Sequence, residues 1–384
     1  MSVSDKVIKI QWLDAIRSND ISKVQDLYEK HREELVQVKD SNDKSGLHYA
    51  CQYGRTEIVQ FLVERGADGL DLDIWHVRPI HYAIRRGHLP IVQYLHEQNC
   101  GFYPIPICMV GLNPRHRNGA AEVHFATQAI IRGHIQMLKY FVTNGVEVPA
   151  KGLYYACGID RSGRFSNLPI VRYLFTGMED DDEEVADGEN NRRGKKGKHI
   201  DTFSCFQFDS MEGVNALRIA CYNKNHEIAK YLVEHGVDVN RLGDYTLEFA
   251  VSQQIRNTYS TLALACCEPK RYRSTVNLET VKLLVNHSAD IHAGQPSRNL
   301  ALEAACSCGF YQHGLLEPRS ELIRYLIDNG ASVTSTTIFR TMQINDLKVI
   351  KFLAEELAVP DICGVKDYDN HGRTILHMAC QRGH

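Results

Sequence analysis

The hydrophobic and polar residues of positions 44–68 follow the pattern of two short amphipathic helices. A polar turn precedes Leu47 and Ala50, which recur at helical spacing until Gly54. A second apolar stripe then runs to Gly66 and comprises Ile58, Val59, Phe61, Leu62 and Val63. Glycine ends a helix readily because it adopts the left-handed conformation at little cost. Since two such helices cannot bury their own apolar faces, we expect the unit to recur along the chain.

The unit recurs when the chain is aligned on Ala50, the small residue inside the first helix. The equivalent positions are Ala83, Ala129, Ala156, Ala220, Ala265, Ala305, Thr341 and Ala379. The first step is 33 residues, and an L-H pair and a G-H turn accompany it. These motifs are found at Leu47-His48, Ile80-His81, Leu376-His377, Gly87-His88, Gly133-His134 and Gly383-His384.

In this period and in these motifs the chain resembles the ankyrin-repeat family over nearly its whole length. The resemblance implies an all-α fold, an ankyrin-repeat solenoid of stacked helix-turn-helix units with inserted loops. It also implies that the histidine of the L-H pair makes hydrogen bonds between neighbouring turns. That role is structural, so the recurring histidines carry little information about catalysis.

The repeat positions and the composition divide the chain into four predicted segments. We predict a degenerate N-terminal capping repeat at 1–40 and a first block of ankyrin repeats at 41–177, with a loop insert at about 100–122. An acidic run and a basic run without large apolar residues predict a disordered linker insert at 178–210. The second block of repeats, 211–384, ends in an incomplete repeat, so we expect the natural chain to continue past His384.

Composition and charge narrow the class of partner. The net charge is −3 and no apolar run approaches the ~18–20 residues of a membrane helix, so we predict no nucleic-acid partner and no membrane partner. The first residues of the sequence lack the apolar core and the cleavage site that are typical of a signal peptide. We expect a monomeric, cytoplasmic protein, with nuclear import through the basic run Arg192–Lys198 as the alternative.

The cysteines and histidines follow the repeat and do not form a reactive site. Six of the twelve cysteines directly follow an alignment position, where a small buried side chain is needed: Cys51, Cys157, Cys221, Cys266, Cys306 and Cys380. The sequence holds no H-E-x-x-H, no G-x-S-x-G and no kinase motif set, and its cysteines do not form paired C-x-x-C knuckles. We therefore predict that the protein is not an enzyme and needs no cofactor or metal.

Three turns between the paired helices are longer than the others. From the alignment alanine to the second-helix apolar position the spacing is 9 residues at Ala50 but 15, 16 and 18 at Ala156, Ala265 and Ala305. Equivalent turns lie along one edge of a solenoid, so the extra residues predict an aromatic and basic ridge; the alternative is loop insertions that cost little free energy. The candidate partner-binding residues on tips and long turns are Trp75, Arg78, Phe102, Tyr103, Arg164, Phe165, Arg271, Tyr272, Arg273 and Tyr311.

Two functional hypotheses follow from these features. The first is an ankyrin-repeat scaffold or adaptor that mediates protein-protein interaction through its concave face and extended turns. The alternative is the targeting arm of a larger protein, such as a ubiquitin-ligase adaptor, a kinase or a channel, whose effector domain lies beyond residue 384. In both hypotheses the partner is a protein whose identity the sequence does not give.

Overall fold

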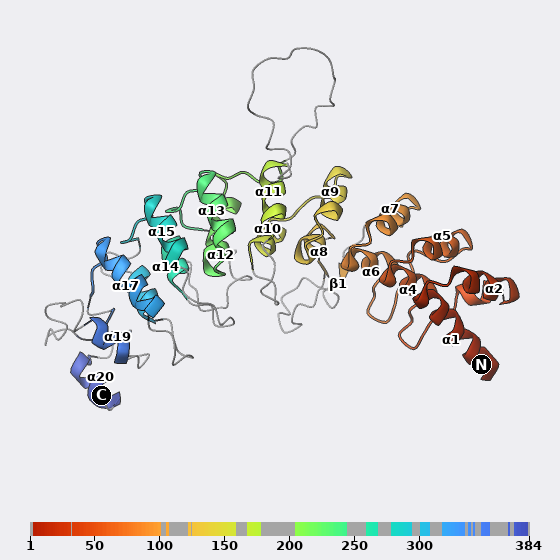
Figure 1. Ribbon diagram of the computed structural model, residues 1–384, viewed down its shortest axis with the longest axis horizontal. Coiled ribbons are helices and arrows are strands. Elements are labelled where there is room, and N and C mark those ends of the chain that lie inside the picture. The colour runs from red at the N-terminus through yellow and green to blue at the C-terminus, as the bar shows by residue number, and fades with distance from the viewer. Residues whose placement is uncertain are drawn as a thin grey trace, which may run out of the picture. The chain divides into compact units, whose positions relative to one another are not determined.

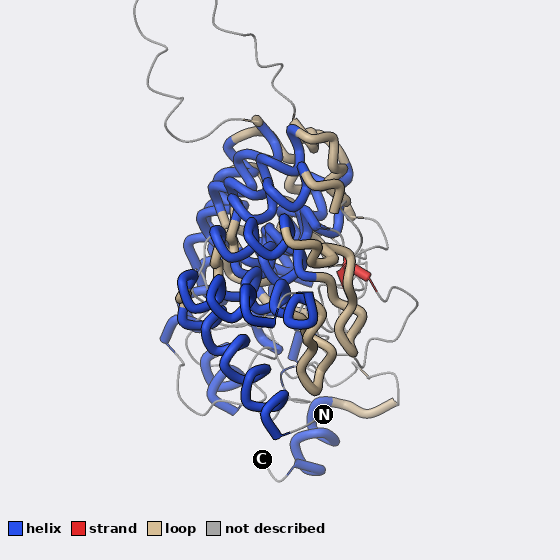
Figure 2. The backbone as a smooth tube through the Cα atoms, turned by 90° about the vertical axis from the view of Figure 1, so that its right-hand side faces the viewer, coloured by secondary structure: helices blue, strands red, loops and turns tan. Residues whose placement is uncertain are grey.

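The structure is a computed structural model, and its described part is almost entirely helical (Figure 1; Figure 2). The described residues are 3–31, 33–100, 105–106, 122–123, 125–158, 167–177, 204–243, 259–267, 278–293, 300–307, 317–334, 337–338, 341, 347–353, 368 and 372–382. The chain divides into two compact units, Met1–Gly152 and Leu153–His384.

The helices of the first unit come in pairs that repeat along the chain. Its elements are α1 (Val3–Ser18), α2 (Ile21–His31), α3 (Glu33–Val36), α4 (Gly46–Tyr53), α5 (Thr56–Glu64), α6 (Pro79–Arg86), α7 (Leu89–Glu97), β1 (Ile105–Pro106), β2 (Glu122–Val123), α8 (Phe125–Arg132) and α9 (Ile135–Thr143). The helix α4 packs between α1 and α6, and α6 also packs against α8. Each first helix therefore buries its apolar side against the next repeat.

The second unit, taken by itself, has the same arrangement of paired helices. Its elements are α10 (Ala150–Cys157, shared with the end of the first unit), α11 (Leu168–Thr176), α12 (Met211–Tyr222), α13 (His226–Glu234), α14 (Thr261–Cys266), α15 (Leu278–Asn286), α16 (Leu300–Ser307), α17 (Glu317–Asp328), α19 (Leu347–Lys351) and α20 (Ile375–Arg382). First helices form one row, α12, α14 and α16, while second helices form another, α13, α15 and α17. The predicted all-α solenoid of stacked helix-turn-helix units is confirmed.

Local sequence signals explain where α4 begins and ends. The Ser45 backbone N–H donates to Nδ1 of His48 (3.1 Å), and the Ser45 hydroxyl lies 2.8 Å from the same nitrogen. This contact satisfies one of the donors that a helix start leaves without a partner inside the helix. At the other end Gly54 has φ +71°, the left-handed conformation that glycine adopts without strain.

Histidine and arginine join neighbouring repeats at equivalent positions. Because Nδ1 of His48 accepts from Ser45, its Nε2 carries the proton and donates to the Val77 carbonyl (3.0 Å), just before the next first helix. Arg218 occupies the equivalent position in α12, and its guanidinium donates to the Tyr259 carbonyl (2.9 Å), just before α14. The inter-repeat hydrogen bond predicted for the L-H histidine is thus present at His48 and is made by an arginine at position 218.

The alignment positions and most of the aligned cysteines are buried. Ala50, Ala83 and Ala129 are fully buried, as are the cysteines that follow an alignment position in the described part of the chain, apart from Cys380, which is exposed. Burial raises the pKa of the Cys221 thiol to about 12. The buried thiols therefore behave as small apolar groups, and the packing role predicted for Cys380 stays a prediction.

The two predicted inserts are described only at their edges. The strands β1 and β2 pair antiparallel, with Ile105 opposite Val123, so a short ladder closes the base of the insert predicted at about 100–122. Of the linker predicted at 178–210, residues 204–210 are described. The backbone N–H groups of Cys205 and Phe206 both donate to the Leu174 carbonyl (2.9 and 3.1 Å), which ties this end of the segment to α11.

Candidate functional site

Two loops of the first unit, each of which connects one helix pair to the next, are built on the same side-chain contacts. We call residues 39–45 the first finger and residues 68–78 the second finger. In the first, the Asp40 carboxylate accepts from the backbone N–H groups of Asn42 (2.8 Å) and Lys44 (2.9 Å) and from the Tyr49 hydroxyl (2.6 Å). These internal donors bend the loop and bind its carboxylate to α4.

The second finger repeats this arrangement 33 residues later. Asp73 accepts from the backbone N–H groups of Trp75 and Val77 (both 2.9 Å) and from the Tyr82 hydroxyl (2.6 Å). The carboxylate oxygens of both aspartates therefore accept hydrogen bonds from backbone N–H groups of their own finger and from the tyrosine hydroxyl of the following helix. These hydrogen bonds stabilise the negative charges of the two carboxylates within the protein.

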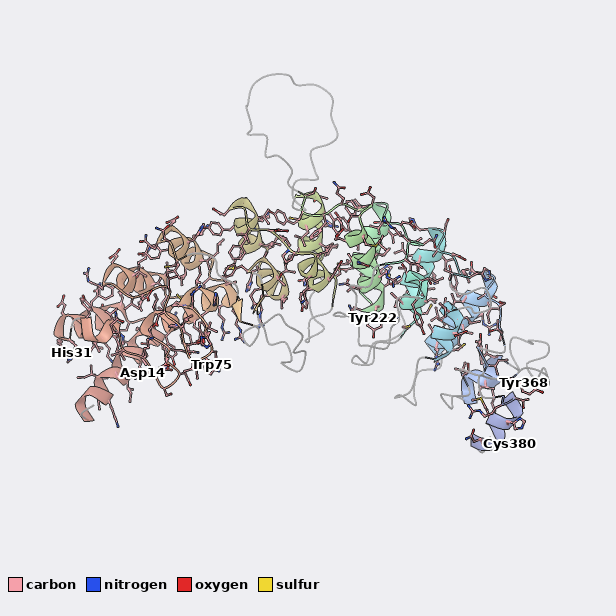
Figure 3. All side chains as sticks on the ribbon, turned by 180° about the vertical axis from the view of Figure 1, so that it is seen from behind. Asp14, His31, Trp75, Tyr222, Tyr368 and Cys380 are labelled. Atoms are coloured by element: carbon pink, nitrogen blue, oxygen red, sulfur yellow. The ribbon has the colours of Figure 1, made fainter. Side chains whose placement is uncertain are left out.

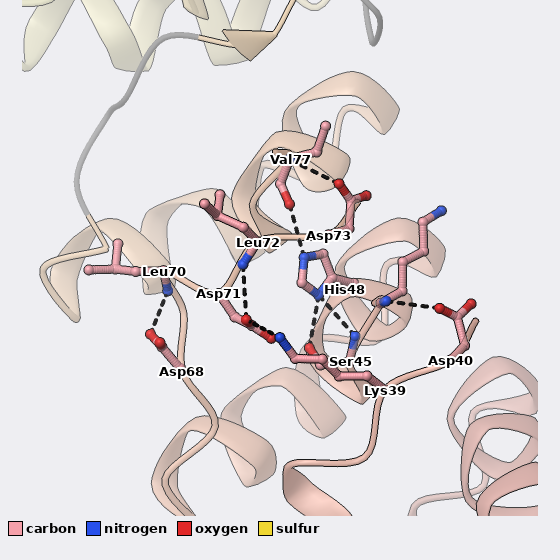
Figure 4. A network of polar contacts seen from close by, with 11 residues as sticks. Lys39, Asp40, Ser45, His48, Asp68, Leu70, Asp71, Leu72, Asp73 and Val77 are labelled. Atoms are coloured by element: carbon pink, nitrogen blue, oxygen red, sulfur yellow. Dashed lines mark hydrogen bonds and ion pairs between the residues drawn. The ribbon is translucent and has the colours of Figure 1, made fainter. Parts of the chain in front are cut away.

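The fingers are also held to each other, as the close view of their polar contacts shows (Figure 4). Lys39 of the first finger forms an ion pair with Asp71 of the second. The Ile74 backbone N–H donates to the Asn42 carbonyl (3.1 Å). Two loops that are one repeat apart in the sequence thus form one surface of defined geometry.

Lys44 lies among three aromatic rings at this surface. Its Nζ is 4.4 Å from the ring centroid of Tyr82, 5.4 Å from Trp75 and 5.9 Å from Tyr49. A cation at these distances is attracted by the negative face of each ring. Among the described residues, no hydrogen-bond acceptor or ion-pair partner contacts the Lys44 ammonium group, so its three donors remain available.

A second cation extends the cluster towards α1. The guanidinium carbon of Arg17 lies 4.3 Å from the ring centroid of Tyr49, and the Tyr49 ring stacks on Tyr53 with 6.3 Å between centroids. We call Arg17, Lys44, Tyr49, Tyr53, Trp75 and Tyr82 the cation–ring strip. Burial lowers the pKa of Lys44; Asp73 and Asp40 oppose this shift, whereas the positive charges of Arg85 and Arg17 add to it. The strip therefore holds the positive charges of Lys44 and Arg17 close together, and the negative charges of Asp40 and Asp73 offset only part of the lowering of the Lys44 pKa.

Exposed apolar side chains gather on the second finger beside this strip. In the described part of the chain, four of the nine large apolar side chains that are exposed lie within residues 70–75: Leu70, Leu72, Ile74 and Trp75. Trp75 is 43% exposed and projects from the edge of the unit (Figure 3). A run of exposed apolar residues on a loop of fixed geometry is typical of a docking surface.

The structure places two of the ten predicted binding residues at the fingers. Trp75 is part of the strip, while Arg78 precedes α6 and its backbone N–H donates to His81 Nδ1 (3.1 Å), so the His81 side chain caps the start of this helix. Phe102, Tyr103, Arg164, Phe165, Arg271, Tyr272, Arg273 and Tyr311 lie outside the described residues. The predicted ridge of long turns therefore stays a prediction.

Sequence reasoning missed Lys44 and two of the rings that lie around it, Tyr49 and Tyr82. A signal for them exists, since an aspartate precedes a tyrosine by nine residues at both Asp40 and Asp73. Two such pairs one repeat apart indicate a shared structural role.

Other kinds of site are not found within the described ranges. No group of three or more histidine, cysteine, aspartate or glutamate side chains there could hold a metal ion. The described helices include none long and apolar enough to cross a membrane. The nine cysteines that the structure describes are free thiols.

Comparisons with known proteins agree with the helical repeat. The family model for ankyrin repeats (3 copies) matches residues 12–103 and 123–271. A curated relative, a putative ankyrin repeat protein of Acanthamoeba polyphaga mimivirus, is 27% identical over 118 residues, which cover 31% of this chain and 31% of the relative. The match therefore spans about a third of the relative's length. With the family model matching most of the chain and the repeat contacts present in the structure, the protein belongs to the ankyrin-repeat family.

Proposed function

We propose that the chain is a protein-interaction scaffold or adaptor, and that the fingers of its first unit form a principal docking surface. Ankyrin repeats generally mediate protein-protein interactions, and the family is typically non-enzymatic. The observation that carries the proposal is the cluster of exposed apolar side chains at residues 70–75, next to rings and cations of fixed geometry. Aromatic and arginine side chains contribute most of the binding free energy at protein interfaces.

The rigidity of the fingers supports this use. Their hydrogen bonds to Asp40 and Asp73 and the Lys39–Asp71 ion pair hold the loops before a partner arrives. A preorganised loop loses less conformational entropy on binding, so more of the contact free energy contributes to affinity. The long turns near Arg164, Tyr272 and Tyr311 form the second surface of the proposal, supported by their sequence alone.

Affinity capture from cell lysate with three forms of the chain tests the proposal. The forms are the unmodified chain, a finger variant (Leu72→Ser with Ile74→Ser) and a long-turn variant (Arg164→Ala, Tyr272→Ala and Tyr311→Ala). We expect a reproducible partner that the finger variant loses, with an unchanged circular dichroism spectrum. Capture that survives both variants would contradict the proposal that the fingers and long turns mediate docking.

A further inference from the structure

We propose that the cation–ring strip binds an extended acidic segment of a partner protein, in which carboxylates alternate with apolar residues. This inference deepens the proposed function and depends on it. The carboxylates would lie on Lys44 and Arg17, and the apolar side chains, which point to the other side of an extended segment, would pack on the exposed Leu72 and Ile74 of the second finger.

The charges around Lys44 favour an anionic ligand. The positive charges of Arg85 and Arg17 both act on the Lys44 ammonium group. The nearby carboxylates are engaged: Asp14 pairs with Arg17 (3.1 Å), and Asp40 and Asp73 point their oxygens at donors of their own finger. Positive charge therefore gathers at Lys44, although the whole chain carries a net charge of −3.

The environment of Lys44 makes it the central contact of the strip. Three rings lie within about 6 Å of its ammonium group and attract its charge, but a ring face offers no oxygen acceptor for the N–H donors of that group. A carboxylate placed on Nζ would supply acceptors in a site that is already partly desolvated, where charge-assisted hydrogen bonds are stronger than in water. Burial lowers the pKa of Lys44, with Arg85 and Arg17 contributing, so an incoming negative charge would also relieve repulsion among these cations.

The spacing of the cations fits an extended chain. Lys44 and Arg17 share the ring of Tyr49, at 5.9 and 4.3 Å from its centroid. An extended peptide advances about 3.3 Å per residue, so carboxylates two residues apart are separated by roughly 7 Å and point to the same face. The intervening residues point to the other side, where apolar groups can meet the exposed second finger.

A peptide is favoured over a nucleic acid by the acidic residues of the same loops. Asp43, Asp68 and Asp71 belong to the fingers, and the side chains of Asp43 and Asp68 are exposed. Their charges would repel a continuous phosphate backbone, whereas a segment with one carboxylate every second residue can place them away from these aspartates. The exposed Leu72 and Ile74 also match apolar partner residues.

The test is a fluorescence titration with blocked hexapeptides. The probe alternates leucine and glutamate, and its matched control carries glutamine in place of glutamate. Trp12 is buried and Trp75 is exposed, so a change in tryptophan emission that disappears in Trp75→Phe reports on the strip. We expect saturable binding of the glutamate peptide that weakens with added sodium chloride, and no binding of the glutamine peptide.

Variants of one lysine establish the role of charge. Lys44→Gln should weaken binding about tenfold or more, while Lys44→Arg should retain most of it. Lys23→Gln, which removes an exposed lysine of α2, is the matched control and should bind as the unmodified chain does. Equal urea midpoints for the variants show that the fold is intact.

The outcomes separate this inference from the proposed function. No binding of the glutamate peptide, or equal loss in Lys44→Gln and Lys23→Gln, would overturn the acidic-segment proposal. If the finger variant still loses its partner in affinity capture, the docking surface stands and only its ligand chemistry is wrong. Tight binding of a single-stranded oligothymidine probe, lost in Lys44→Gln, would instead assign the strip to nucleic acid.

Discussion

Replacing Gly54 by alanine should destabilise the first unit through a contact between neighbouring repeats. Gly54 has φ +71°, and a Cβ built on it would lie 2.6–2.9 Å from three ring atoms of His88, in the next repeat. The same pairing recurs one repeat later, where a Cβ on Gly87 would lie 2.8–3.1 Å from the ring of His134. Histidine rings thus pack on glycine at two successive turns.

The magnitude follows from two separable costs. A non-glycine residue in the left-handed region costs roughly 1–2 kcal/mol. Gly66 has φ +84°, and a Cβ added there would meet nothing within 4 Å, so Gly66→Ala should show this cost alone. Gly54→Ala adds displacement of the His88 ring, for which overpacking of about 1–3 kcal/mol is typical. We therefore expect Gly54→Ala to lower the free energy of unfolding by about 2 kcal/mol more than Gly66→Ala.

Urea denaturation followed by circular dichroism at about pH 7.5 measures this difference. The double variant Gly54→Ala with His88→Ala completes a thermodynamic cycle, because the shortened side chain leaves room for the new Cβ. Its loss of stability should be smaller than the sum of the two single losses. Equal destabilisation by Gly54→Ala and Gly66→Ala, with additive behaviour in the double variant, would refute the proposed ring contact.

Three further predictions concern acidity, the fingers and the thiols. Burial lowers the pKa values of His48, His88 and His134 below that of an unfolded histidine, about 6.5. The unfolded chain then binds more protons on acidification, so the urea midpoint should be fully retained above about pH 7 and should fall from about pH 6.5 downwards; a flat midpoint between about pH 7.5 and 5.5 would contradict this. Tyr82→Phe removes the hydroxyl that donates to Asp73 and should cost about 1 kcal/mol in the same assay, whereas Tyr28→Phe, a matched control on α2, should cost less. Iodoacetamide should label the exposed Cys380 in the folded protein and leave the buried Cys221 unlabelled until urea is added, as peptide mass spectrometry can show.

The repeat positions could be predicted from the sequence because burial imposes a period. Ala50, Ala83 and Ala129 are fully buried where the alignment places them, since only a small residue fits between stacked first helices. The site could be predicted less well. The surroundings of Lys44 depend on how two fingers bend, and their bends depend on hydrogen bonds to Asp40 and Asp73 that leave only a faint sequence pattern.

The arginine at position 218 shows a second limit of prediction from sequence. Arginine is rarely buried, so its position in the L-H slot of α12 gave no reason to expect a fully packed side chain. Its relative exposure is 1%, and the carbonyl of Tyr259 accepts its hydrogen bond. The acceptor is equivalent to that of His48, whereas the donor differs in both length and charge. A pattern based on residue type cannot recognise such a functional equivalence.

The exchange of histidine for arginine has a consequence for how such a protein can change during evolution. His48 reaches a carbonyl 29 positions ahead, while Arg218 reaches the equivalent carbonyl 41 positions ahead. The linking bond therefore tolerates a connection of different length, because it depends on where the next helix starts and not on the path of the chain between. New peptide can accumulate between repeats, and be selected for new partners, while the joint between those repeats is preserved.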